Sequence, residues 1–376
     1  MTHHLSPAAR PSTKLVELTG FALCVAQLTI LFALLTKGAW LFDADGNAVA
    51  TDFVNIWAAG RQVVEGSAAL VYDGMIHKHM EVIAVGHSFD GDYPWVYPPP
   101  FFFVATALSL LPYTSAYLVW MAVTFLLYVI AVRLIVGPSS RFLFAVACPA
   151  ILANFVVGQS GFLTAALLGL SLVSMDARPV LSGIFLGLLT FKPHLGILIP
   201  VVLLIDRRWQ VIASATATAV VLAAGSMIAF GYSPWEEFFH LLPLAADATL
   251  VEGQADWGKL QSLYGAVRVL GGTHSIAWTF QVTIAIAAAI AVSLIWRGGY
   301  CFELRAASLA TGTLLATPYI FLYDLVGLAV AMAFLMRAGQ KTGRDLGENV
   351  GLSLARACRH LGDSQISRSV IHEEPS

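Results

Sequence analysis

Long apolar stretches, separated by short polar segments, occupy most of the chain. A helix needs about 20 apolar residues to cross a hydrocarbon layer about 30 Å thick. The first stretch, residues 15–42, follows Arg10 and Lys14 and is too long for the core of a signal peptide, so we predict an uncleaved membrane anchor. Further helices are predicted at residues 113–136, 141–157, 160–175, 179–191, 195–205, 209–231, 276–296, 303–318 and 320–337. The pattern predicts an all-α polytopic membrane protein with about ten transmembrane helices, within a range of about 10–12.

Prolines interrupt this pattern at two places. The stretches on either side of Lys192-Pro193-His194 are short for full crossings. We expect broken or tilted helices there, since these are tolerated where protein or a water-filled cavity surrounds them. Residues 98–112 are also apolar, but prolines bound this stretch at both ends. A re-entrant or interfacial helix fits it as well as an extra crossing does.

Basic residues favour one orientation of these helices, because cytoplasmic loops of membrane proteins carry an excess of Lys and Arg. With a cytoplasmic N-terminus and ten crossings, fifteen of the 21 basic residues fall on the cytoplasmic side. The opposite side then holds Lys37, Arg61, Lys78, Lys192, Lys259 and Arg268. We therefore expect a multi-pass protein of the inner (plasma) membrane whose N-terminus is cytoplasmic.

Two large polar segments, residues 43–97 and 232–275, face away from the cytoplasm in this topology. Within the first, the spacing of apolar residues predicts an amphipathic helix from Phe53 to Val64 that lies along the membrane surface and ends at Gly66. Residues 1–337 are predicted to form a single transmembrane domain that includes both loops. The polar remainder, residues 338–376, is predicted to be a cytoplasmic tail.

Composition narrows the class of protein further. With 58% hydrophobic and 12% charged residues, the chain has half the charge of a typical soluble domain, which has about 25%. This excludes cytosolic enzymes and disordered chains, and a net charge of −2 offers no basic surface for nucleic acid. The four cysteines lie far apart without a CxxC spacing, so they predict neither a disulfide framework nor a zinc site.

Polar residues gather near the predicted outer ends of helices. The apolar stretches at 113–132, 160–175, 209–231 and 276–296 contain no Asp, Glu, His, Lys or Arg. The conspicuous polar groups are instead Asp52, Gln159, Ser160, Lys192, His194, Gln261, Ser262, Tyr323 and Asp324. An enzyme that works at the outer interface would have this arrangement, whereas transporters usually place ionisable groups near the bilayer midplane.

Two of these residues each have two interpretations. Asp52 precedes a helix, so its side chain could simply cap that helix, or it could be a carboxylate base that takes a proton from an acceptor hydroxyl. Both can hold at once. Lys192 could extend to the membrane interface as lysines near helix ends do, or it could bind a phosphate beside the helix terminus that Pro193 exposes.

Metal binding is the less favoured alternative. The pairs Asp43-Ala44-Asp45 and Asp90-Gly91-Asp92 suit a divalent cation, but the pattern is short and lies in turn-like sequence. His77, His79 and His87 could form a zinc site with Asp73. A spacing of two does not place helical residues on one face, so we interpret these histidines as loop residues and predict no metal site.

Several short motifs together resemble glycosyltransferase family 87, a family of integral membrane enzymes in the GT-C superfamily. They are Thr51-Asp52-Phe53, Tyr97-Pro98-Pro99-Pro100-Phe101, Gly158-Gln159-Ser160, Phe191-Lys192-Pro193-His194, Gln261-Ser262 and Tyr323-Asp324-Leu325. Each motif is weak alone, but their order over residues 50 to 330 is fairly specific. The chain departs from the resemblance after Arg337, where it turns polar while relatives continue with hydrophobic helix.

The resemblance implies a GT-C-like helical bundle whose two large loops carry interfacial helices. It implies transfer of a hexose, with mannose as the default, from a polyprenyl-phosphate sugar to an extracytoplasmic glycolipid or glycan. Asp52 would be the base, and Lys192, His194, Gln159, Gln261 and Tyr323 would bind the donor phosphate or substrate. The leaving phosphate is already an anion, so no cofactor is required. The alternatives are a lipid or solute transporter, a flippase, or a non-catalytic membrane protein of envelope assembly.

Overall fold

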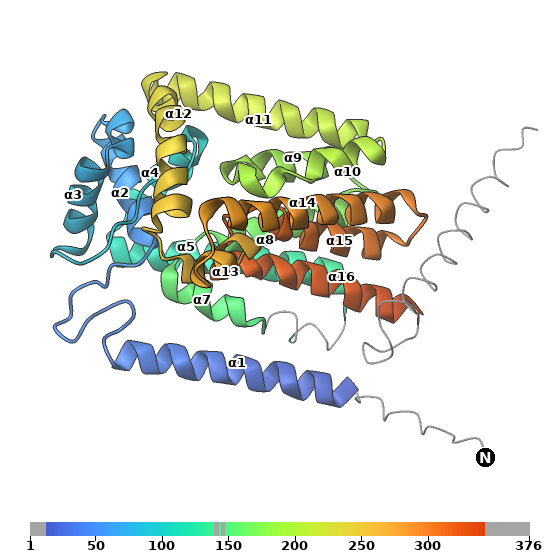
Figure 1. Ribbon diagram of the computed structural model, residues 1–376. Helices are drawn as coiled ribbons and strands as arrows, with labels where there is room; N and C mark the ends of the chain where they lie inside the picture. Colours follow the sequence, from blue (N-terminus) through green and yellow to red (C-terminus); the bar gives the residue numbers. More distant parts are fainter. Residues whose placement is uncertain (1–12, 139–142, 144–146, 343–376) are drawn as a thin grey trace, which may run out of the picture.

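The computed structural model describes residues 13–138, 143 and 147–342. In these residues every regular element is helical, and the only extended pairs are isolated bridges. The prediction of an all-α protein is therefore confirmed for the described part of the chain. Most helices run roughly parallel to one another, and shorter elements form a lobe at one end (Figure 1).

Within the described part of the chain, five helices are long and apolar enough to cross a membrane. They belong to α1 (Thr13–Thr36), α5 (Tyr113–Val136), α11 (Trp209–Phe230), α14 (His274–Arg297) and α16 (Val326–Thr342), the last together with the 3-10 turn that precedes it. Their length and composition are those of a membrane-embedded protein. The predicted number of about ten crossings is not tested by this observation and stays a prediction.

The remaining predicted apolar stretches contain shorter helices. These are α7 (Pro149–Val157), α8 (Gly161–Ser174), α9 (Pro179–Leu188), α10 (Ile199–Ile205) and α15 (Phe302–Leu315). The predicted break at Pro193 is confirmed, because two 3-10 turns, Leu189–Phe191 and Pro193–Gly196, separate α9 from α10. Lys192 leaves the helical region, with φ −124° and ψ 72°, as expected for a residue that precedes proline.

The lobe contains α2 (Phe53–Val64), α3 (Gly74–Val85) and α4 (Phe102–Ser109). The bounds of α2 are those predicted from its apolar spacing, and Gly66 follows its end with a φ of +80°. The helix is buried on more sides than a surface helix would be, because Gly60 lets it approach α4 so closely that a Cβ atom there would lie 2.0 Å from the carbonyl oxygen of Ala105.

One prediction in the lobe is wrong: His77 and His79 belong to helix α3 rather than to a loop. The helix begins where the side chain of Asp73 accepts hydrogen bonds from the backbone N–H groups of Met75 and Ile76. Asp followed by Gly is a common turn signal, and here the same Asp caps a helix. His77 is buried, with its Nδ1 atom 2.8 Å from Oε1 of Gln62.

Residues 98–112 form no long helix. They contain the 3-10 turn Pro99–Phe101 and α4, and eight α-helical residues extend only about 12 Å. The re-entrant or interfacial alternative therefore describes this segment better than a full crossing does.

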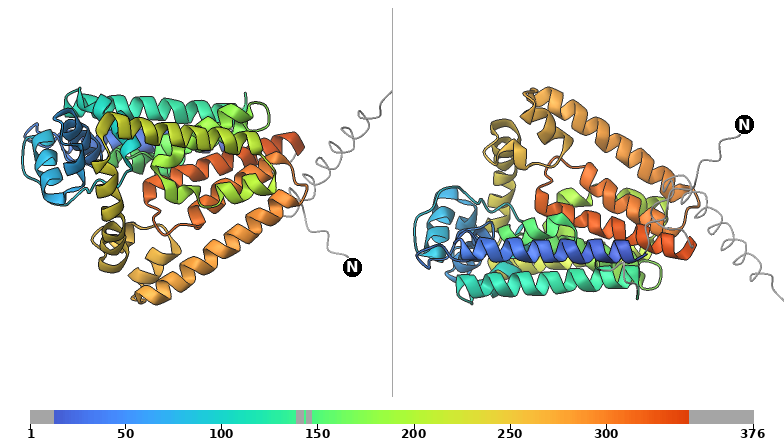
Figure 2. Two further views of the ribbon diagram at one scale, coloured as in Figure 1. Left: turned by 90° about the horizontal axis from the view of Figure 1, so that it is seen from above. Right: turned by 90° about the horizontal axis from the view of Figure 1, so that it is seen from below.

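The second polar segment contains α12 (Ser233–Ala246), a π-helical turn (Asp247–Glu252), a 3-10 turn (Trp257–Lys259) and α13 (Leu263–Val269). It leads into α14, which runs obliquely to the other long helices with its N-terminal end farthest from them (Figure 2). Helix α16 continues to Thr342, so the first residues of the predicted tail are helical. The rest of that tail, residues 343–376, lies outside the described residues, as do 139–142 and 144–146 of the predicted helix 141–157.

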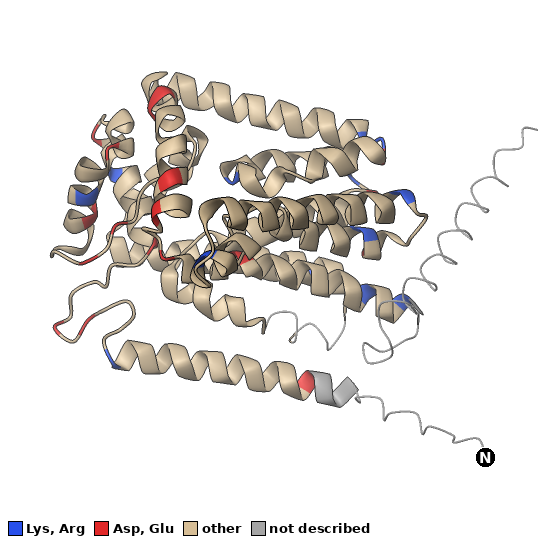
Figure 3. Ribbon diagram, in the orientation of Figure 1, with Lys and Arg blue, Asp and Glu red and all other residues tan. Residues whose placement is uncertain are grey.

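Charged residues divide between the two ends of the molecule. Asp and Glu concentrate at the end formed by α2, α3 and α12, whereas several Lys and Arg residues lie at the opposite end of the long helices (Figure 3). The candidate site residues lie on elements that meet toward the acidic end.

Candidate functional site

Asp52 directly precedes α2, but its side chain makes no capping hydrogen bond to that helix. Its backbone is already helical, with φ −54° and ψ −21°, whereas a capping residue usually has extended backbone. The capping interpretation of Asp52 is therefore wrong. The carboxylate is instead partly buried and interacts with the side chain of Gln159, which lies far from it in the sequence.

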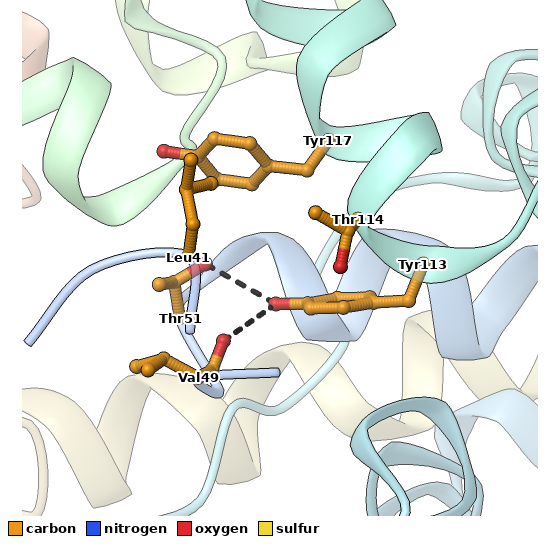
Figure 4. A pocket seen from close by; sticks show the side chains of 6 residues that line it. All are labelled: Leu41, Val49, Thr51, Tyr113, Thr114 and Tyr117. Atoms are coloured by element: carbon orange, nitrogen blue, oxygen red, sulfur yellow. Dashed lines mark hydrogen bonds between the residues drawn. The ribbon is translucent and has the colours of Figure 1, made fainter. Parts of the chain in front are cut away.

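The segment that leads to Asp52 is held by Tyr113 of α5. The Tyr113 hydroxyl donates to the carbonyl oxygen of Val49 over 3.2 Å and lies 3.4 Å from Oγ1 of Thr51 (Figure 4). A small pocket opens here, lined by Leu41, Val49, Thr51, Tyr113, Thr114 and Tyr117. These bonds fix the backbone on the N-terminal side of Asp52.

Gln159 lies in the tight turn between α7 and α8. Gly158 has a φ of +74°, and a Cβ atom there would lie 2.7 Å from the Cβ atom of Phe53, which follows Asp52. The Gln159 side-chain oxygen accepts hydrogen bonds from the Tyr97 hydroxyl, over 2.8 Å, and from the backbone N–H of Ser160, over 3.1 Å. Since the oxygen is occupied by these donors, the amide nitrogen is the group that can donate to Asp52.

The surroundings of Asp52 make its carboxyl group a weaker acid than an ordinary aspartate. Burial raises the pKa of Asp52 to about 6, although Gln159 and the charges of Lys259 and Lys192 act in the opposite direction. A carboxyl group with a pKa near 6 is largely ionised at neutral pH and is a stronger base than an ordinary aspartate. Asp52 thus has the properties that proton abstraction requires.

Lys192 and Asp324 form a buried ion pair. The Nζ atom of Lys192 lies 2.6 Å from Oδ1 of Asp324, and the two residues are 5% and 2% exposed. The other oxygen of Asp324 accepts from the backbone N–H of Phe321 over 3.2 Å. The sequence placed Asp324 near the same end of the molecule, but it contained no signal for the pairing because 132 positions separate the partners.

The other three predicted site residues lie around this pair. The Nζ atom of Lys192 is 5.0 Å from the centre of the Tyr323 ring, and His194 is close enough to Lys192 and Asp324 to be affected by both charges. The Nε2 atom of His194 is buried without a hydrogen-bond partner among the described residues. Gln261 is exposed, and its amide nitrogen donates to its own loop, to the carbonyl oxygen of Lys259 over 3.3 Å.

The backbone of Gln261 links the second polar segment to the ion pair. Its N–H donates to the carbonyl oxygen of Ile320 over 2.6 Å, and Leu260 forms an isolated bridge with Phe321. The structure therefore brings the segments that carry Asp52, Gln159, Lys192, Gln261 and Asp324 together at one end of the long helices. It gives contacts to Tyr97 and Asp324, two motif residues without a predicted role, and it places Lys259 two residues before Gln261.

No group of three or more His, Cys, Asp or Glu side chains in the described ranges is arranged to hold a metal ion. The Asp43 carboxylate accepts from the backbone N–H groups of Asp45 and Asn47, over 2.9 Å and 2.8 Å, so this aspartate stabilises a turn.

The helices and the site define an all-helical membrane protein with a buried carboxylate–cation cluster at one end. The particular family follows from a comparison with protein-family models: the model of glycosyltransferase family 87 matches residues 95–318, which is more than half of the chain. The chain belongs to this family and is therefore a membrane glycosyltransferase. No curated protein and no solved structure matches it. Asp52, Tyr323 and Asp324 lie outside the matched range, whereas Gln159, Lys192, His194 and Gln261 lie within it.

Proposed function

We propose that this glycosyltransferase moves a hexose, with mannose as the first candidate, from a polyprenyl-phosphate sugar to an extracytoplasmic glycolipid or glycan. The observation that carries the proposal is the environment of Asp52. Its carboxylate caps no helix, is partly buried and interacts with Gln159, and the charges of Lys259 and Lys192 lower its pKa. A carboxylate base next to cations suits a reaction in which an alcohol attacks a sugar phosphate.

In the proposed mechanism, Asp52 takes the proton of the acceptor hydroxyl while the hydroxyl oxygen attacks the anomeric carbon from the side opposite the phosphate. The bond between the sugar and the phosphate breaks, and its electron pair remains on the phosphate oxygen. The configuration at the anomeric carbon is inverted. Gln159 orients Asp52, and its position is fixed by its bond from Tyr97.

The phosphate and sugar of the donor are proposed to bind to the side chains of Lys192, His194, Gln261 and Tyr323. Their backbones meet at the Lys192–Asp324 pair and at the hydrogen bond from Gln261 to Ile320. His194 offers a buried ring nitrogen without a partner among the described residues, which a donor oxygen or hydroxyl could engage. We propose that no metal is needed, because the leaving group is already a stable anion and requires charge stabilisation more than protonation.

We further propose that the site faces away from the cytoplasm, in the inner membrane, with the N-terminus inside. The distribution of charge supports this orientation, since several Lys and Arg residues lie at the end of the long helices opposite the site (Figure 3). Nucleotide sugars are cytoplasmic, so a site on the outer face needs a donor that the membrane carries.

The test is a transfer assay with purified protein in lipid nanodiscs, radiolabelled polyprenyl-phosphate mannose and a crude envelope-lipid extract as acceptor. We expect the wild type to form a labelled glycolipid in the presence of EDTA and the Asp52→Asn variant to lose at least about 100-fold in rate. Asp45→Asn is the matched control, since Asp45 is an exposed carboxylate of the same polar segment. Equal rates for Asp52→Asn and the wild type would refute the base.

The same samples separate the enzyme from its rivals. A new glycosidic bond identifies a transferase, whereas movement of intact labelled lipid between leaflets without a new bond identifies a flippase. A panel of polyprenyl-phosphate mannose and polyprenyl-phosphate glucose tests the sugar.

A further inference from the structure

The charge balance of the site points to one more residue, in an inference that rests on the proposed function. A polyprenyl-phosphate sugar carries one negative charge on its phosphodiester, and the phosphate gains another when the bond to the sugar breaks. Stabilising that charge requires a cation that is not already neutralised. Lys192 does not meet this requirement alone, because Asp324 balances its charge at 2.6 Å in a buried pair.

Most other basic side chains at this end of the molecule also have an ion-pair, hydrogen-bond or aromatic partner. Arg61 pairs with Glu65 over 2.9 Å, and the Nζ atom of Lys78 lies 3.7 Å from Glu81. The Arg268 guanidinium covers the Trp257 ring at 3.9 Å and donates to the carbonyl oxygen of Val251 over 3.0 Å. The ammonium group of Lys259, by contrast, is exposed and has no hydrogen bond or ion pair to any residue that the structure describes.

The turn that presents Lys259 is tightly built. Asp256 has a φ of +61°, a conformation that residues other than glycine rarely adopt. Its side chain accepts from the backbone N–H of Gly258 over 2.9 Å, and its carbonyl oxygen accepts from the N–H of Lys259 over 2.9 Å. Strained backbone that surrounding contacts maintain is common at ligand-binding sites. Trp257 holds the turn from the other side by donating to the carbonyl oxygen of Leu250 over 3.1 Å.

The same turn is joined to the site by main-chain contacts. Leu260 bridges to Phe321, and the N–H of Gln261 donates to Ile320. These partners lie just before Asp324, the partner of Lys192. The backbone next to Lys259 is therefore attached to the segment that precedes Asp324, and the charge of Lys259 lowers the pKa of Asp52.

We propose that Lys259 is the cation that binds the phosphate of the lipid donor and faces the charge that develops on it. The acceptor oxygen forms its bond to the anomeric carbon, the acceptor proton passes to Asp52, and the electron pair of the broken bond goes to the phosphate oxygen beside Lys259. Lys192, paired with Asp324, supplies hydrogen-bond donors without adding net charge. Lys259 thus supplies the positive charge at the phosphate, and Lys192 supplies hydrogen bonds to it.

The experiment measures binding rather than turnover, with polyprenyl phosphate as the probe and polyprenol, which lacks the phosphate, as its comparison. Wild type, Lys259→Gln, Lys259→Arg and Lys37→Gln are compared in phosphatidylcholine nanodiscs. Lys37 is the matched control because it is an exposed lysine in the linker that follows α1. We expect Lys259→Gln to weaken binding of polyprenyl phosphate about tenfold or more, Lys259→Arg to retain most of it, and Lys37→Gln to change nothing.

Each failure has its own signature. If the wild type prefers polyprenyl phosphate over polyprenol and Lys259→Gln retains that preference, the assignment of Lys259 is wrong and the proposed function survives. If the wild type binds both lipids equally, the lipid-phosphate donor itself is wrong. If phosphatidylglycerol competes with labelled polyprenyl phosphate as well as unlabelled polyprenyl phosphate does, Lys259 contacts anionic lipid in general and the assignment is also overturned.

Discussion

The Nζ atom of Lys192 lies 2.6 Å from the Oδ1 atom of Asp324, and water reaches neither side chain to any large extent. The pair joins the break between α9 and α10 to the 3-10 turn Leu322–Leu325 that precedes α16. Two segments 132 positions apart are thereby fixed beside each other.

Removing one partner of this ion pair should destabilise the folded protein. Asp324→Asn leaves the Lys192 ammonium buried beside a neutral amide, and uncompensated buried charges of this kind typically destabilise a protein by about 3–5 kcal/mol. We expect a lower melting temperature for Asp324→Asn and for Lys192→Met in detergent micelles. The double variant Lys192→Met/Asp324→Asn should lose less than the sum of the two single changes, because no unpaired charge is left. Additive losses would show that the two groups do not interact.

The transfer reaction should depend on the ionisation of Asp52. Burial raises its pKa to about 6, and the proposed base works only when it is ionised. The rate should therefore increase as the pH rises from about 5 to 7, with a midpoint near 6 in kcat/KM. A profile that is flat over this range would exclude a base with this acidity.

The same carboxyl group should reduce stability at higher pH. Its pKa is near 3.8 when exposed and about 6 in the folded protein, so the folded state holds a proton that the unfolded state has lost between these values. Asp52→Asn should therefore raise the melting temperature at pH 8, where the wild type must bury a charge, and this advantage should shrink at pH 4. Melting curves of both proteins at the two pH values measure the difference.

Gly161 allows the turn that carries Gln159 to meet the segment that carries Asp324. A Cβ atom at this position would lie 2.3 Å from the carbonyl oxygen of Tyr323 and 2.7 Å from Oδ1 of Asn154. Gly161→Ala should therefore force backbone to move, with lower thermal stability and a loss of transfer activity. Gly196→Ala is the control, since a Cβ atom there meets nothing within 4 Å. Similar behaviour of the two variants would contradict the close approach.

Glu81 should make the stability of the lobe depend on pH. Its buried carboxyl group has the Nζ atom of Lys78 and the Nε2 atom of His77 each 3.7 Å from one of its oxygens. Burial raises the pKa of Glu81 from 4.5 to about 8. The contribution of its proton to stability is complete below pH 4.5 and is lost as the pH rises to about 8. Glu81→Gln should remove this part of the dependence, so its melting temperature should fall less than that of the wild type between pH 5 and 8.

Much of the fold could be predicted because the signals are local. The helix Tyr113–Val136 follows from an unbroken apolar run between Pro112 and Gly137, and Phe53–Val64 follows from apolar spacing that ends before Gly66. The sequence does not decide the structure of α3, since Asp73 and the spacing of the histidines are compatible with both a turn and a helix. The number of helices that cross a membrane is harder to predict. Short helices can span it only where other helices pack around their ends, and this depends on tertiary contacts that the sequence pattern does not show.

The site could be predicted only as a collection of residues near one end. The sequence indicates that Asp52, Gln159 and Lys192 belong to that end, because polar residues cluster where apolar stretches stop. It cannot indicate that Asp324 neutralises Lys192 or that Lys259 has no partner among the described residues. Those facts depend on distances between segments, and no pattern along the chain encodes them.

The hydrogen bond from the backbone N–H of Gln261 to Ile320 has an evolutionary consequence. Every amino acid except proline supplies the same N–H, so substitutions in this loop can accumulate without loosening its attachment. Gln261 can therefore diverge between related enzymes that act on different sugars while the frame around the ion pair is inherited unchanged.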